Sequence, residues 1–146
     1  MGAGKEMDEA VAVLMGWKRV DDLSDEEVAA YIKEGWQSDR IPTKDDIHNQ
    51  RMRWIVGGEC DCAKWMRSDG IPCVSIPHYS TDIIAAFQVV NMVVGKKYVE
   101  WTLEMMWYDG PDYVMTFHGA DSEYKANGVT IPEAICGAAL MCKICK

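Results

Sequence analysis

The sequence predicts a small α+β domain in which an antiparallel β-meander of about three strands is covered by helices, an α/β/α sandwich-like architecture. Three observations support this fold class. Apolar residues recur at helical spacing in several segments, apolar and polar residues alternate between residues 99 and 118, and turn residues separate the alternating segments. With 146 residues the chain has the length of one domain, so we expect residues 1–146 to form a single domain.

Two helices are expected in the first quarter of the chain. Apolar residues recur at helical spacing over Lys5–Met15, and Gly16 follows as a stop. Ser24 and Glu27 have the spacing of a capping box, which predicts a second helix that ends at Gly35. Both helices are predicted by local signals at their ends.

A third helix is expected after Thr43, where two acidic residues follow a capping hydroxyl and Trp54 lies on the apolar face. Residues 60–76 contain three cysteines, a glycine and a proline without a clear period. We therefore expect that segment to be irregular.

The next helix is predicted to start at Ser80. Pro77 interrupts whatever precedes it, Ser80 is placed to cap the helix, and Asp82 puts a negative charge in the first turn. A broad apolar stripe begins at Ile83, and Gly95 ends the helix.

A meander and a last helix complete the chain. Alternation predicts strands over residues 99–107 and 113–118, with a short third strand over residues 123–126 and turns at residues 109–112 and 127–128. The first strand is expected to face the core with Trp101, Leu103 and Met105. Thr130 and Glu133 form a second capping box, which predicts a final helix over residues 131–144.

Five segments resemble the phage α/β/α (ABA) sandwich domain family of small phage and prophage proteins. They are Gly4–Val11, Met15–Trp17, Tyr79–Ile83, Ala85–Val90 and Pro132–Leu140. The resemblance implies helices flanking a small antiparallel sheet and a phage setting, and it carries no catalytic residues. Family members often have Trp where Phe87 stands and Arg where Gly137 stands. Compared with the family, residues 21–57 are expected to be a helical insertion within the domain.

Charge and hydropathy narrow the classes of partner. The chain has 15 Lys and Arg against 23 Asp and Glu, a net charge of −8, which disfavours bulk nucleic acid and anionic membranes. No stretch has the apolar length of a membrane span or a signal peptide. We expect a protein of the host cytoplasm that uses no cofactor.

The cysteines leave two interpretations open. A zinc ion could be held by Cys60, Cys62 and Cys73 with His78, or Cys142 and Cys145 could donate ligands instead. The spacing does not match a standard zinc finger. Reduced thiols without a metal are the favoured interpretation.

The helix start at Ser80 is also the best candidate ligand site. Free amides and hydroxyls at a helix N-terminus can hold a phosphate, with aromatic rings stacking on a base and lysines supplying charge. The candidate residues are His78, Tyr79, Ser80, Thr81, Lys96, Lys97, Trp107 and Tyr108. Capping alone explains the same residues, and Asp82 would repel an anion, so the structural interpretation is favoured.

No nucleophile, metalloprotease or phosphate-loop motif is found near His48, His78 or His118, so we expect no enzyme. The main hypothesis is a phage-encoded binding protein that counteracts host immunity by sequestering a nucleotide-derived signal in a homo-oligomer. The alternatives are an acidic module that inhibits a host protein, as a DNA mimic would, and a structural or accessory phage protein.

Overall fold

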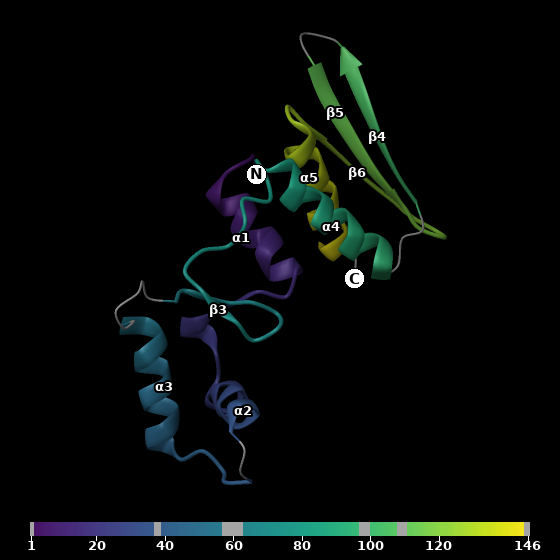
Figure 1. Cartoon of the computed structure of the whole chain (residues 1–146). Helices are drawn as coiled ribbons and strands as arrows, with labels where there is room; N and C mark the ends of the chain where they lie inside the picture. The colour runs from purple at the N-terminus through teal and green to yellow at the C-terminus, as the bar shows by residue number, and fades with distance from the viewer. Residues whose placement is uncertain (1, 37–38, 57–62, 97–99, 108–110, 145–146) are drawn as a thin grey trace. The chain divides into compact units, whose positions relative to one another are not determined.

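The computed structural model describes residues 2–36, 39–56, 63–96, 100–107 and 111–144. The chain divides into two compact units, which are treated separately below (Figure 1). Unit 1 comprises residues 1–15 and 77–146, and unit 2 comprises residues 16–76. The expected insertion, residues 21–57, lies inside unit 2; the single-domain organisation stays a prediction. In the part of the chain that is described, no helix has the length and apolar character needed to cross a bilayer.

Unit 1 is an antiparallel meander with helices, as the fold class predicts. Its elements are α1 (Lys5–Leu14), α4 (Ile83–Lys96), β4 (Glu100–Trp107), β5 (Pro111–His118), β6 (Glu123–Gly128) and α5 (Ile131–Ile144). The sheet order is β4-β5-β6, so β5 is the central strand. The third strand is longer than predicted: Gly128 still pairs with Tyr113, so the expected turn at residues 127–128 is wrong.

The core of unit 1 forms where α5 packs on the sheet. Met115 and Phe117 of β5 and Ile135 of α5 are completely buried. Close packing depends on Gly128, because a Cβ there would lie 2.5 Å from the backbone nitrogen of Ala134. A larger residue at this position would push α5 off the sheet.

Strand β4 has the predicted orientation, but its core-facing side chains are only partly buried. Trp101 pairs with Phe117 and Leu103 pairs with Met115, so these side chains share the face of the core. Leu103 is nevertheless only half-buried, and Trp101 and Met105 are 40% and 52% exposed. The three residues therefore face the core as predicted but are only partly buried, because β4 is an edge strand and α5 packs on β5 and β6.

Helix α4 begins at Ile83 and not directly after Ser80. The Ile84 N–H donates to Asp82 Oδ1 at 2.9 Å, which is the capping contact at this end. Before it, the carbonyl of His78 accepts from the amides of Thr81 and Asp82, so the chain makes a turn there. The prediction that Ser80 caps the helix is wrong, because Ser80 is buried and bonded elsewhere.

Unit 2 consists of two helices and a small sheet. Its elements are β1 (Lys18–Arg19), the 3₁₀ helix η1 (Val20–Asp22), α2 (Asp25–Gly35), α3 (Lys44–Val56), β2 (Trp65–Met66) and β3 (Pro72–Cys73). The antiparallel sheet has the order β1-β2-β3. Two strands thus lie in the segment expected to be irregular, and at two residues each they are too short to show a period.

Local capping explains both helices of unit 2. Ser24 and Glu27 form the predicted capping box at the start of α2. At α3 the Asp46 N–H donates to Thr43 Oγ1 at 3.2 Å, and the Thr43 N–H donates to Asp46 Oδ2 at 2.8 Å. The helices enclose a core made of Val20, Leu23, Val28, Ile32 and Met66.

Candidate functional site

The predicted ligand site around Ser80 is occupied by a carboxylate of the chain itself. The Ser80 N–H and hydroxyl donate to Asp8 Oδ1 at 2.7 and 2.6 Å, and the Gly4 N–H donates to Ser80 Oγ at 2.9 Å. Ser80 is fully buried, and Asp8 is 5% exposed. An incoming phosphate would reach the donors of Ser80 only after Asp8 had moved away.

The other predicted contacts are spread over unit 1. Tyr79 is buried in the core, whereas the side chain of His78 is 79% exposed and its Nδ1 lies 3.7 Å from Asp8 Oδ2. Thr81, in the turn before α4, and Trp107, at the end of β4, are both exposed. Lys97, Tyr108 and the side chain of Lys96 lie outside the described residues. Ligand binding at this set stays a prediction.

Cys136 is a buried thiol beside the Asp8 cluster. Burial raises its pKa to about 12, and the charge of Asp8 adds to the shift. The thiolate that a nucleophile or metal ligand needs is therefore scarce at neutral pH.

The zinc hypothesis stays a prediction. Cys60, Cys62 and Cys145 lie outside the described residues. Cys73 belongs to β3 of unit 2, and His78 belongs to unit 1. Where the chain is described, no group of three or more His, Cys, Asp or Glu side chains could hold a metal ion.

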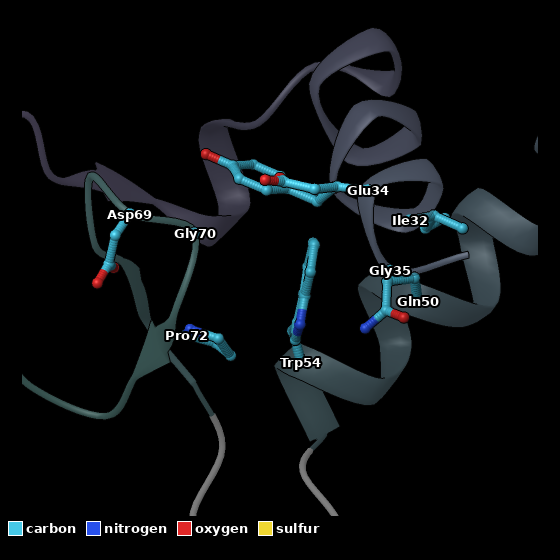
Figure 2. Close-up of a pocket in the computed structure, with 9 residues that line it drawn as sticks. Ile32, Glu34, Gly35, Gln50, Trp54, Asp69, Gly70 and Pro72 are labelled. Carbon is cyan, nitrogen blue, oxygen red and sulfur yellow. The ribbon is translucent and has the colours of Figure 1, made fainter. Parts of the chain in front are cut away.

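Unit 2 contains a pocket that sequence reasoning missed. It has a volume of about 290 Å³ and lies between α2, α3 and the turn before β3 (Figure 2). Its lining includes Tyr31, Glu34, Gln50, Trp54, Asp69 and Gly70. The rings of Tyr31 and Trp54 meet edge to face, with centroids 6.2 Å apart and an interplanar angle of 83°.

The turn of the pocket fits closely against the aromatic wall. Gly70 has a positive φ of 87°, and a Cβ there would lie 3.3 Å from Cε1 of Tyr31. Figure 2 shows Trp54 between this turn and the helix that carries Ile32 and Gly35. Glycine is therefore favoured at position 70 by the backbone and by the neighbouring ring.

The charges of the lining are negative. Among the residues that the structure describes, the lining includes Glu34 and Asp69 and contains no Lys, Arg or His. Arg67 donates hydrogen bonds to Asp69 and holds the pKa of that carboxyl below its ordinary value. In Figure 2 the Asp69 carboxylate points away from Trp54. The Glu34 carboxylate makes no hydrogen bond or ion pair with any other described residue, so it is the available charge.

Unit 1 is an antiparallel meander packed with helices, and unit 2 combines two α-helices with a small sheet. These features define an α+β protein of sandwich type. The sequence profile of the phage ABA sandwich domain matches residues 10–140, and the chain belongs to this family. It is a phage protein with an ABA sandwich domain, as the resemblance predicted.

A solved structure of a phage protein is among those that match the chain. It is the 2.0 Å crystal structure of a phage protein from Bacillus cereus ATCC 14579, with 24% sequence identity and a TM-score of 0.42. The match covers 73% of this chain and 91% of that one. No curated protein matches the chain.

Proposed function

We propose that this phage protein is a binding protein without catalytic activity, and that it inhibits a basic host protein by taking a cationic side chain into the Tyr31–Trp54 pocket. The observation that carries the proposal is an aromatic pocket lined by Glu34, whose carboxylate has no partner among the described residues, with no cationic side chain among the described residues of the lining. Cations bind favourably over Trp and Tyr faces, and more strongly where water is excluded.

An ammonium or guanidinium group on an aliphatic stem suits this pocket better than a free metal ion. The stem can pack along the rings while the charged head reaches Glu34. The net charge of −8 also favours encounter with a basic partner and disfavours bulk nucleic acid and anionic membranes. This function places the protein in the host cytoplasm.

Calorimetric titration with peptides tests the proposal. An arginine-rich peptide and its lysine counterpart should bind at low ionic strength, and an otherwise equal glutamate peptide should not. Trp54→Ala should weaken binding of the basic peptides about tenfold or more, since it removes one wall of the pocket.

The matched control is Trp107→Ala, which removes an exposed ring from unit 1. It should leave peptide binding unchanged. Equal losses in the two variants, or equal binding of basic and acidic peptides, would rule out a cation pocket.

The second candidate is sequestration of a nucleotide-derived immune signal by a homo-oligomer. The exposure of Trp107, at 66%, and of the His78 side chain, at 79%, favours it, because both rings could stack on a base. Titration with cyclic nucleotides and cyclic ADP-ribose isomers tests it. If a nucleotide releases heat of binding with the Trp54→Ala variant but not with Trp107→Ala, this second function would be favoured over the first. If none of these ligands gives a heat of binding, the second function is ruled out.

A further inference from the structure

The two edges of the unit 1 sheet differ in how they are protected. Edge strands usually avoid unwanted pairing by being short or by carrying charged residues, lysine above all, proline or a bulge. β6 has six residues, including Lys125 and the terminal Gly128. β4 has eight residues, and Glu100 and Glu104 are its only charged ones. It has no lysine or proline and is not short, so these two carboxylates are the only such protection of a long, largely apolar strand.

β4 also carries a high density of exposed apolar side chains. The exposed fractions are 40% for Trp101, 52% for Met105, 42% for Met106 and 66% for Trp107. The Trp101 ring has an aromatic neighbour in Phe87 of α4, at a centroid distance of 5.8 Å. One end of the β4–β5 hairpin projects past α5 in Figure 1. Exposed apolar patches of this kind mark interaction surfaces.

We propose that β4 is a homodimer interface, at which β4 of one copy pairs antiparallel with β4 of a second copy about a twofold axis through Leu103. The two meanders then form one continuous sheet. The inference concerns unit 1 alone and does not depend on the pocket of unit 2.

The charge pattern of β4 selects this register. With the axis at Leu103, Trp101 lies opposite Met105, and Thr102, which carries no charge, lies opposite Glu104. Glu100 then faces Met106, so no two carboxylates are directly opposed. Like charges directly opposite each other destabilise a strand pair.

The neighbouring registers fail the same criterion. With the axis at Glu104, that residue would meet its own copy, and with the axis at Thr102, Glu100 would meet Glu104. An axis at Met105 also avoids opposed carboxylates but pairs a shorter part of β4. In the remaining registers the twofold axis passes between two residues. The core-facing side chains of the two copies would then lie on opposite faces of the joined sheet.

A second copy fits the edge better than an unrelated strand for two reasons. A partner strand needs an apolar side chain at every second position and no acid opposite Glu100 or Glu104, and β4 itself meets both requirements. A twofold interface also closes, because each β4 edge covers the other and the remaining edges are the protected β6 strands.

Mass measurement and directed cross-linking test the interface together. Light scattering and native mass spectrometry of the full chain should give twice the 16.4 kDa monomer mass at micromolar concentration. Met105→Lys should shift the protein to the monomer, since it buries a charge against Trp101 of the second copy. Val129→Lys, at a residue that is 69% exposed outside β4, should leave the dimer intact.

Leu103→Cys tests the register. Opposed Cα atoms in an antiparallel pair lie about 4.5–5.5 Å apart, within reach of a disulfide. Under mild oxidation this variant should cross-link to a dimer well above the background from the native cysteines, and Met105→Cys should not. If Met105→Lys fails to fold, judged by circular dichroism, the cysteine pair still decides the question.

A monomer at all concentrations, or a dimer that survives a folded Met105→Lys variant, would overturn the proposed interface. A dimer in which Met105→Cys cross-links and Leu103→Cys does not would overturn the register. If the chain stays monomeric and β4 binds an added peptide strand, the partner of β4 would be a strand of another protein and not a second copy of this chain.

Discussion

An acidic residue lies beside polar or aromatic groups in each unit, but the two arrangements are opposite in kind. In unit 1 the Asp8 carboxylate is buried and accepts two hydrogen bonds from Ser80. In unit 2 the Glu34 carboxylate is exposed and lies at an open pocket without a bonding partner among the described residues. The Asp8 carboxylate therefore stabilises the fold of unit 1, whereas the Glu34 carboxylate is available to a ligand.

The largest effect that we predict is a low chemical reactivity of the Cys136 thiol in unit 1. Raising the pKa from 9.0 to about 12 lowers the thiolate fraction about a thousandfold at a given pH. We expect alkylation by iodoacetamide, followed by mass spectrometry of peptides, to leave Cys136 unmodified while the half-buried Cys73 reacts.

Denaturant supplies the control for this measurement. Cys136 should react as fast as Cys73 once the chain is unfolded. Rapid labelling of Cys136 in the folded protein would contradict the tight packing of α5 on the sheet.

The second prediction is a loss of stability when the buried carboxylate of Asp8 is removed. Asp8→Ala removes the acceptor of the buried Ser80 amide and leaves the hydroxyl only the Gly4 carbonyl at 3.4 Å, which should cost about 1–3 kcal/mol of unfolding free energy. Urea denaturation measures it. Glu6→Ala, an exposed acid in the same helix turn, should change the free energy by less than about 0.5 kcal/mol. If Asp8→Ala and Glu6→Ala changed the unfolding free energy equally, Asp8 would have no special role in stabilising the fold.

These two units also show what sequence could predict. The helices of unit 2 were predicted because Ser24 and Glu27, or Thr43 and the acids after it, are neighbours in sequence. Ser80 was assigned to the wrong partner because Asp8 lies 72 residues away. A capping residue and a buried core serine therefore have the same local sequence pattern.

Burial and pockets were predicted less well, since both depend on which elements meet. The alternation in β4 gave the correct face for Trp101, but it could not show that the helices cover the edge strand only in part. Tyr31 and Trp54 come from different helices, and no local spacing indicates that their rings meet. An aromatic residue on each of two adjacent amphipathic helices was the only signal for the pocket.

The third prediction separates the two carboxylates of the pocket. Glu34→Gln should weaken binding of an arginine-rich peptide about tenfold, or about 1.4 kcal/mol, and reduce its salt dependence. Asp69→Asn should have a smaller effect, because Arg67 already neutralises that carboxylate. Calorimetry at two ionic strengths measures both.

Glu26→Gln, an exposed position on the same helix, is the matched control and should bind as the parent does. If Asp69→Asn weakened binding more than Glu34→Gln, the cation would have to be placed at the turn and not at α2.

The smallest effect that we predict concerns Asp46, a half-buried carboxylate that caps α3 and also accepts a hydrogen bond from Arg40. Hydrogen bonds from the backbone and side chain of Thr43, assisted by Arg40, lower the pKa of Asp46 below its ordinary value of 3.8. A lowered pKa in the folded state adds stability that is complete above about pH 4 and is lost as the pH falls through the folded value. Asp46→Asn should therefore flatten the acid side of the stability curve of unit 2, measured by circular dichroism. Asp45→Asn, one residue earlier on the same turn, should leave it unchanged, and an equal flattening would show that net charge and not the cap at Thr43 sets the acid response.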